Sequence, residues 1–200
     1  MNIIFLTGLT ACGKSEIAEN EGRELGMPVV SLSDVYHSVA ERFGFEHIRE
    51  MVDVRGIPFS LDQGRNALAE VVNETRSENG VIVDDLFDFH TMAYIRDRFD
   101  LAVFETYADT CEPLVLVVHV DARESARIER HAKWMRSNIE EAGKWVRYLD
   151  DFRERAGIRA AMRAADFKID NNRPLSGVLR EVHAELGARL KQIRGGVERS

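Results

Sequence analysis

Short apolar runs alternate with longer amphipathic segments along the chain. Runs at residues 3–7, 28–32, 81–84, 114–120 and 167–170 have the length and continuous apolar character of strands buried on both faces. Helical spacing follows over residues 15–25, 61–77, 90–110, 122–135, 139–165 and 174–194, with a shorter helix opened by Ser33 or Asp34. Strands that alternate with helices predict a three-layer α/β fold of about five parallel strands with helices on both faces and ligands at the carboxyl ends of the strands.

Some stretches carry a weaker pattern. Residues 42–60 contain two glycines and a proline, which predicts a mobile connection. Residues 90–110 favour a helix, although 101–104 alone could form a strand. We expect a single domain over residues 1–194, followed by a frayed tail at 195–200.

The first apolar run breaks into a glycine-rich loop. This loop reads Gly8-Leu9-Thr10-Ala11-Cys12-Gly13-Lys14-Ser15, the pattern of a phosphate-binding loop, and it lies between a predicted strand and a predicted helix as that pattern requires. Its glycines let backbone N–H groups turn toward phosphates, and the N-terminus of the next helix favours an anion. Lys14 is expected to act on the terminal phosphates and Ser15 to bind Mg²⁺. All residues of the loop are therefore predicted to bind ATP.

Acidic residues close two of the predicted strands at one edge of the sheet. Asp84 ends the run at 81–84 and is the candidate Mg²⁺ ligand, directly or through water, but the adjacent Asp85 leaves the assignment open. Asp34 follows the second run. Its carboxylate could orient or deprotonate an acceptor hydroxyl as a catalytic residue, and the alternative is a helix cap.

Cations recur at three- to four-residue spacing after the strand at 114–120. They are Arg123, Arg127, Arg130, Lys133 and Arg136. Because phosphoryl transfer depends on positioning and charge neutralisation, this spacing predicts a cationic lid over about residues 123–147. Glu124 and Glu129 leave open an ordinary solvated face of ion pairs.

Other residues of the central and lid segments allow two further predictions. A phosphoryl acceptor could be gripped by the arginines of the central segment, which are Arg42, Arg49, Arg55 and Arg65. Trp134 and Trp145 are expected to serve core or hinge packing rather than base stacking.

Composition and charge exclude several classes of function. The net charge of −7 does not suit binding of polymeric nucleic acid, whereas a small anion in a locally basic pocket is compatible with it. No apolar stretch approaches the roughly 20 residues of a membrane span, and the N-terminus lacks a basic region, so we expect a cytoplasmic protein without membrane contact. Cys12, Cys111 and the scattered histidines indicate neither a disulfide framework nor a zinc site.

Several motifs together resemble one known family. Besides residues 8–16, they are Ser33-Asp34-Val35, Val81-Ile82-Val83-Asp84, Arg127-Ile128-Glu129-Arg130, Arg136-Ser137 and Ala164-Ala165-Asp166-Phe167-Lys168-Ile169-Asp170-Asn171-Asn172. Over nearly its whole length the chain resembles the nucleotide-kinase-like proteins related to dephospho-CoA kinase, especially an archaeal branch of them. The resemblance implies a nucleoside-monophosphate-kinase-type fold that uses ATP and Mg²⁺. It also implies a lid in which Arg127 contacts nucleotide and Arg130 and Arg136 act in catalysis, with Asn171 and Asn172 near the adenine.

The chain departs from this family at two points. Trp134, beside Lys133, stands where relatives tend to place a second lid arginine. The segment 85–88 lacks the arginine that monophosphate kinases place shortly after the acidic strand end. Dephospho-CoA kinase also lacks that arginine and uses a strand-end aspartate like Asp34 on a ribose hydroxyl.

The sequence therefore predicts an ATP-dependent kinase that transfers a phosphoryl group to a small nucleotide or nucleotide-like acceptor, as a monomer or homodimer. One alternative is dephospho-CoA kinase itself. Another is a nucleotide-binding switch or regulatory module without catalysis, because a fold does not certify a function. The sequence names neither the acceptor nor a preference for ATP over GTP.

Overall fold

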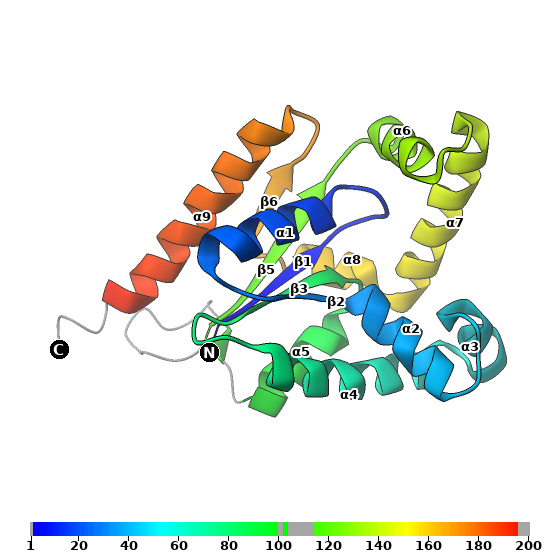
Figure 1. Cartoon of the computed structure of the whole chain (residues 1–200), viewed down its shortest axis with the longest axis horizontal. Coiled ribbons are helices and arrows are strands. Elements are labelled where there is room, and N and C mark those ends of the chain that lie inside the picture. Colours follow the sequence, from blue (N-terminus) through cyan, green and yellow to red (C-terminus); the bar gives the residue numbers. More distant parts are fainter. Residues whose placement is uncertain (1, 100–101, 104–113, 196–200) are drawn as a thin grey trace.

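A parallel sheet forms the centre of the molecule (Figure 1). The computed structural model describes residues 2–99, 102–103 and 114–195. Its strands are β1 (Ile3–Thr7), β2 (Val29–Ser31), β3 (Val81–Leu86), β4 (Ala102–Val103), β5 (Leu114–Asp121) and β6 (Phe167–Asp170). They follow the order β2-β3-β1-β5-β4, and β6 also pairs with β5. The strands predicted from the sequence are all present, and every pairing is parallel.

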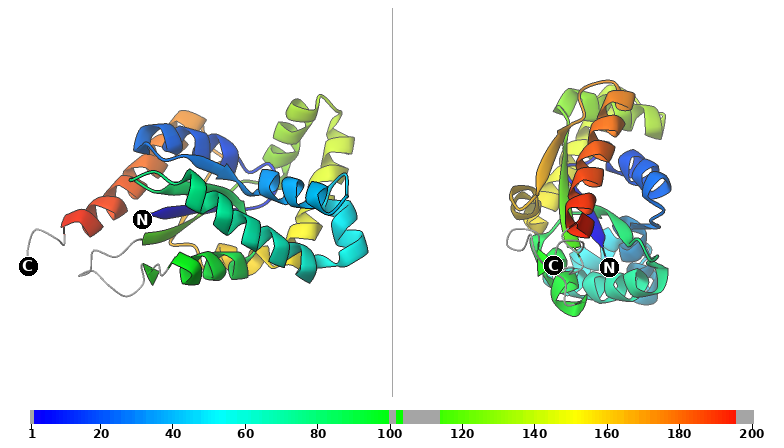
Figure 2. Two further views of the ribbon diagram at one scale, coloured as in Figure 1. Left: turned by 60° about the horizontal axis from the view of Figure 1, so that its bottom comes forward. Right: turned by 90° about the vertical axis from the view of Figure 1, so that its left-hand side faces the viewer.

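Side chains of β1 alternate between two cores, one on each face of the sheet. Ile4 and Leu6 pack with α1 (Lys14–Leu25) and α9 (Leu175–Gly195). Ile3 and Phe5 belong to the opposite core, which is covered by α2 (Leu32–Arg42), α4 (Ile57–Thr75), α5 (Phe89–Phe99) and α8 (Ile158–Arg163). Figure 2 shows helices on both sides of the sheet. Because both faces are covered, the strands read as continuous apolar runs.

Two further helices, α6 (Glu124–Met135) and α7 (Ile139–Ala156), pack together beyond the carboxyl end of β5 (Figure 1). We call them the α6–α7 hairpin. The helix ends that flank its connection expose large apolar side chains, and Trp134 near the end of α6 is 76% exposed. Of the two roles predicted for Trp134, core packing is therefore wrong, and hinge packing stays a prediction.

The segment at 42–60 is helical from Ile48 onward except at Gly56, whereas residues 43–47 form turns and bends, so the connection is shorter than predicted. The segment holds α3 (Ile48–Arg55), anchored by the fully buried Met51, and the start of α4. Gly56 separates the two helices with a φ of 82°, and Pro58 lies in the first turn of α4, where a proline costs no helical hydrogen bond. Gly56 and Pro58 thus mark a boundary between helices, whereas Gly44 lies in the turn at 43–47.

Three other boundaries differ from the prediction. The helix expected to reach residue 110 ends at Phe99, and β4 follows within residues 101–104, the stretch that could have formed a strand. Cys111 and most of the expected tail lie outside the described residues, which omit 104–113 and 196–200. Gly157, with a φ of 101°, divides the helix expected at 139–165 into α7 and α8. Ser31 caps α2, because its Oγ accepts the Asp34 N–H at 3.2 Å.

Within the described ranges, no helix is both long and apolar enough to cross a membrane.

Candidate active site

The phosphate-binding loop joins β1 to α1 and requires glycine at two places. A Cβ on Gly8 would lie 2.3 Å from the carbonyl oxygen of Val120, and one on Gly13 would lie 2.3 Å from the side-chain nitrogen of Asn171. Their φ angles of 147° and 98° add to this restriction. Helix α1 begins at Lys14, within the last two residues of the loop, so the N–H groups of its first turn remain available to an anion.

Arg130 and Asn171 support the loop at the carbonyl of Cys12. The Asn171 side chain donates to this oxygen at 2.7 Å and Arg130 Nη1 at 3.2 Å, while Arg130 Nη2 donates to the Asn171 carbonyl at 2.6 Å. Asn172 accepts the backbone N–H of Arg123 at 2.8 Å, at the start of the α6–α7 hairpin. The two asparagines predicted near the adenine therefore have different partners in these hydrogen bonds. Asn171 contacts the phosphate-binding loop, and Asn172 contacts the start of the α6–α7 hairpin.

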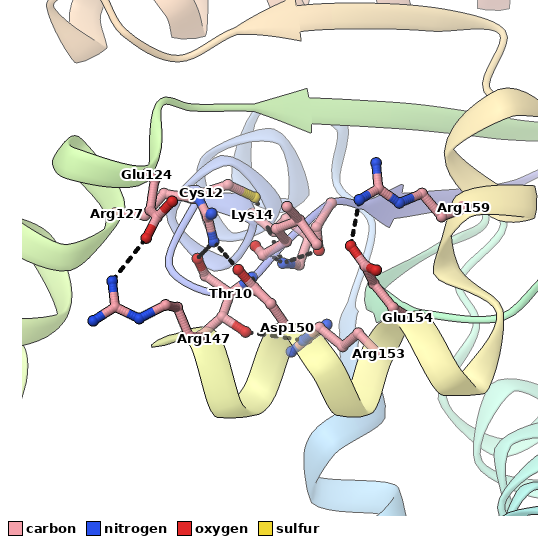
Figure 3. Close-up of polar contacts among 12 residues, drawn as sticks. Thr10, Cys12, Lys14, Glu124, Arg127, Arg147, Asp150, Arg153, Glu154 and Arg159 are labelled. Carbon is pink, nitrogen blue, oxygen red and sulfur yellow. Dashed lines mark hydrogen bonds and ion pairs between the residues drawn. The ribbon is translucent and has the colours of Figure 1, made fainter. Parts of the chain in front are cut away.

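Asp150 of α7 supports the same loop from the other side (Figure 3). One carboxylate oxygen accepts the Thr10 N–H at 2.9 Å and the other accepts Arg127 Nη1 at 2.6 Å. Arg127 also donates to the Thr10 carbonyl at 3.1 Å and is 5% exposed. Arg127 thus contacts the loop backbone as a buried brace, and the sequence did not indicate Asp150 at all.

Lys14 lies inside the loop that it was predicted to serve. Its Nζ donates to the carbonyls of Gly8 and Leu9 at 2.9 and 3.0 Å and lies 3.1 Å from Asp85 Oδ1. These contacts hold the ammonium group of Lys14, a residue that is 5% exposed, beside the end of β3.

A bulge in β3 brings two consecutive carboxylates to this edge of the sheet. Phe5 of β1 pairs with Val83, but Thr7 pairs with Leu86, so β3 holds one extra residue. The extra residue coincides with a left-handed backbone at Asp85, whose φ is 78°. Consecutive residues of a regular strand point to opposite faces, and a bulge redirects one of them. Asp84 and Asp85 can therefore both approach the loop.

Asp84 has the properties of a cation ligand. It is 6% exposed, it is hydrogen-bonded to Ser15, and its Oδ1 has no hydrogen-bond partner in the described part of the chain. Burial and the neighbouring charge of Asp85 raise the pKa of Asp84 to about 6. A buried, unpartnered carboxylate oxygen beside a hydroxyl suits a hard divalent cation. The predicted pair of Ser15 and Asp84 therefore fits Mg²⁺.

Asp85 is committed to cationic partners instead. Arg153 of α7 makes two bonds to it, with 2.6 Å between Nη2 and Oδ2, and Ser33 Oγ donates to Oδ2 at 3.2 Å. Burial raises the pKa of Asp85, but the charges of Arg153 and Lys14 outweigh it and hold the pKa below its ordinary value. Asp85 is therefore an ionised hydrogen-bond acceptor. The sequence analysis did not single out Arg153, although its helical spacing with Leu149 could have placed them on one face.

Two cavities lie on either side of the Asp85–Arg153 pair. The loop cavity, of about 420 Å³, is lined by the phosphate-binding loop and by residues of the α6–α7 hairpin that include Arg130 and Trp134. The aromatic cavity, of about 390 Å³, is lined by Tyr36, Phe87, Trp145, Tyr148 and Phe152 together with Ser33 and Arg49. Asp85, Leu149 and Arg153 line both. The cavities lie at the carboxyl edge of the sheet, as predicted.

Asp34 and Arg136, both predicted to be catalytic, are placed elsewhere. Asp34 is exposed and lines a separate hollow between α2 and α4, and the described linings of the loop and aromatic cavities do not include it. Its neighbour Ser33 faces the aromatic cavity, since consecutive helical residues point about 100° apart. Arg136 is exposed at the end of α6 with a φ of 53° and is likewise absent from both linings.

Comparison of the sequence with known proteins places the chain in a family. A family model, AAA_17, described as an AAA domain, matches residues 7–144, which is more than half of the chain. The chain belongs to this AAA domain family. It is 29% identical over 182 residues to a UPF0200 protein of Thermococcus onnurineus, covering 86% of this chain and 89% of the relative. It is 28% identical over 175 residues to a UPF0200/UPF0201 protein of Archaeoglobus fulgidus. This match covers 86% of this chain but only 50% of the relative.

Solved structures of two kinases have the same fold. A shikimate kinase from Bacteroides thetaiotaomicron matches 93% of this chain and 98% of its own with a TM-score of 0.59 and 18% identity. A gluconokinase from Sinorhizobium meliloti matches 96% and 95% with a TM-score of 0.62 and 16% identity. At these identities the likeness shows the fold alone, which is that of P-loop kinases.

Proposed function

We propose that the chain is an ATP-dependent phosphotransferase with a small-molecule acceptor of the nucleotide or nucleotide-like kind. One observation carries this proposal. The loop cavity and the aromatic cavity meet at Asp85 and Arg153, next to Lys14. A transferase needs a donor and an acceptor held on either side of one point, and this arrangement supplies both places.

On the donor side, the phosphate-binding loop and Lys14 hold the nucleotide phosphates. Ser15 and Asp84 hold Mg²⁺, which neutralises phosphate charge when bound. Arg130 lines the loop cavity and adds positive charge there, as expected of a catalytic lid residue. Asn171 and Arg127 act through the loop backbone and keep its shape.

On the acceptor side, Asp85 accepts a hydrogen bond from the hydroxyl that receives the phosphoryl group, and Ser33 assists from α2. The low pKa of Asp85 suits orienting the hydroxyl more than removing its proton early. Arg153 neutralises charge at the junction of the two cavities. Asp85 and Arg153 thus take the parts that the sequence analysis gave to Asp34 and Arg136.

Acceptor-dependent formation of ADP tests this function. With Mg²⁺ and ATP, wild-type protein should form ADP faster when one of a panel of small hydroxyl- or phosphate-bearing metabolites is added, and Lys14→Ala should abolish the increase. Arg136→Ala, placed outside both cavities, is the matched control and should retain it. A slow release of ADP that no acceptor accelerates would instead support a nucleotide-dependent switch.

A further inference from the structure

The aromatic cavity has flat apolar walls. Phe87 packs against Tyr36 with ring centroids 5.1 Å apart and against Phe152 at 6.1 Å. Trp145 and Tyr148 of α7 meet edge to face at 5.9 Å and are 38% and 41% exposed, so each leaves part of its ring uncovered. Aromatic walls of this kind favour a planar ring, which stacks or meets them edge to face.

Positive charge gathers at one side of the same cavity. The Arg49 guanidinium lies 4.5 Å from the ring centroid of Tyr148 and 4.9 Å from that of Trp145. The ion pairs found among the described residues do not include Arg49. A guanidinium stacked on rings keeps its N–H edge free for a planar anion, which it can bind with two parallel hydrogen bonds.

Other groups that line the cavity leave this positive charge uncompensated. Within the described lining, Asp85 supplies the acidic side chain, and Arg153 and Lys14 already neutralise it. His37 and His47 also line the cavity and stack on each other at 5.8 Å, with Glu41 3.6 Å from His37. Arg49 is exposed and also lines an adjoining hollow with Glu141 and Lys144, so an anionic ligand in the aromatic cavity would compete with water and Glu141 for its N–H groups.

We infer that the aromatic cavity takes an acceptor that carries a planar ring and an anionic group. The ring lies among the aromatic side chains, the anion binds Arg49, and the hydroxyl points to Asp85. A volume of about 390 Å³ suits a molecule of one or two rings. This inference rests on the proposed function for the role of the ligand as acceptor, but its binding requires no transfer and is tested without ATP.

The two tryptophans of the chain allow a direct binding experiment, because each lines a different cavity. Trp134→Phe leaves Trp145 as the fluorescent reporter of the aromatic cavity. The probes are p-(hydroxymethyl)benzoate, its neutral amide, and the cyclohexane carboxylate of the same outline. We expect the benzoate to change Trp145 fluorescence saturably and to bind about tenfold or more tightly than either analogue, since each analogue removes one recognised feature.

Substitution at Arg49 separates charge recognition from general packing. In the Trp134→Phe background, Arg49→Gln should bring the affinity for the benzoate down to that for the amide. Arg55→Gln is the matched control, because Arg55 lies on the same helix but over Phe59, 5.9 Å away, and outside the described lining. It should leave the preference unchanged, and circular dichroism checks the fold of each variant.

The inference would be overturned if the benzoate bound no more tightly than the amide, or no more tightly than the cyclohexane carboxylate. It would also be overturned if Arg49→Gln still bound the benzoate more tightly than the amide. Absence of saturable binding by the benzoate would overturn it as well. Failure of the proposed function gives a different pattern, in which the probes are discriminated but no acceptor accelerates formation of ADP.

Discussion

Arg153 and Asp85 lie 68 residues apart in sequence and form a two-bond ion pair in the wall between the loop cavity and the aromatic cavity. The pair joins α7 to the bulge of β3. Arg153 Nε also donates to Thr10 Oγ1 at 3.1 Å, so one guanidinium contacts both the strand end and the phosphate-binding loop. The position of the α6–α7 hairpin is therefore coupled to the geometry of the site.

Asp85→Asn should damage both stability and transfer. It leaves Arg153, whose side chain is 14% exposed, without its charge partner, and breaking a buried pair costs about 3–5 kcal/mol. Loss of a positioned carboxylate should also lower acceptor-dependent turnover by a factor on the order of 10². Urea unfolding and turnover per folded molecule measure the two effects. Full turnover in the folded variant would remove Asp85 from the mechanism.

Stability should depend on the charge of Asp84. Its pKa is about 6 in the folded chain against 3.8 ordinarily, so between these values the folded state binds a proton that the unfolded state lacks. The free energy of unfolding therefore falls as pH rises from about 4 to about 6, by on the order of 3 kcal/mol. The lowered pKa of Asp85 acts in the opposite direction, with stability lost as pH falls below about 4.

Asp84→Asn isolates this contribution. The variant should lack the fall between pH about 4 and 6 and should be more stable than wild type at about pH 7, while losing affinity for Mg²⁺ with nucleotide. Unfolding curves across this range and Mg²⁺ titrations measure both. A variant with the wild-type pH profile would show that the Asp84 carboxylate is not penalised by burial.

The structure and the sequence pattern favour different residues for a role in transfer. The structure favours Ser33, which lines the aromatic cavity, whereas the sequence pattern favours its neighbour Asp34. Ser33→Ala should slow acceptor-dependent turnover, because it removes the hydroxyl that donates to Asp85. Asp34→Asn should alter stability by only about 0.5 kcal/mol, through the lost charge in the first turn of α2. Turnover and thermal unfolding of both variants decide between them. A large loss of turnover in Asp34→Asn alone would restore the role predicted from the sequence.

Asp150→Asn should weaken nucleotide binding, although Asp150 is not part of the described lining of the aromatic cavity. The substitution removes the charge that pairs with Arg127, and it weakens the acceptor for the Thr10 N–H. Asp151→Asn is the control, since Asp151 pairs with Arg155 on the exposed face of the same helix. Calorimetric titration with Mg²⁺ and an ATP analogue gives the comparison. Equal affinities in the two variants would contradict the bracing role of Asp150.

The fold was predictable because its signals are local. Continuous apolar runs marked the buried strands, and the spacing from Gly8 to Ser15 marked the loop. Lys14, Ser15 and Asp84 followed from the same pattern, since strand ends and helix starts meet at one edge of a parallel sheet.

The other site residues depend on information that is not local. Asp150 and Arg153 reach the loop across 140 and 143 positions, through the packing of the α6–α7 hairpin. Asp85 turns toward Lys14 because of a register break against β1, which no property of residues 81–86 alone reveals. The sequence also could not separate Asp34 from Ser33, because both are polar and helical but point in different directions, and in this structure Ser33 lines the aromatic cavity.

Transfer of a labelled γ-phosphoryl group tests the central claim most directly. Wild-type protein is incubated with Mg²⁺, γ-labelled ATP and a size-filtered metabolite extract, and the products are separated. Label should appear in an organic phosphate with the wild type and Arg136→Ala, and not with Lys14→Ala or Asp85→Asn. Label found only in ATP and inorganic phosphate with the wild type would contradict a phosphotransferase.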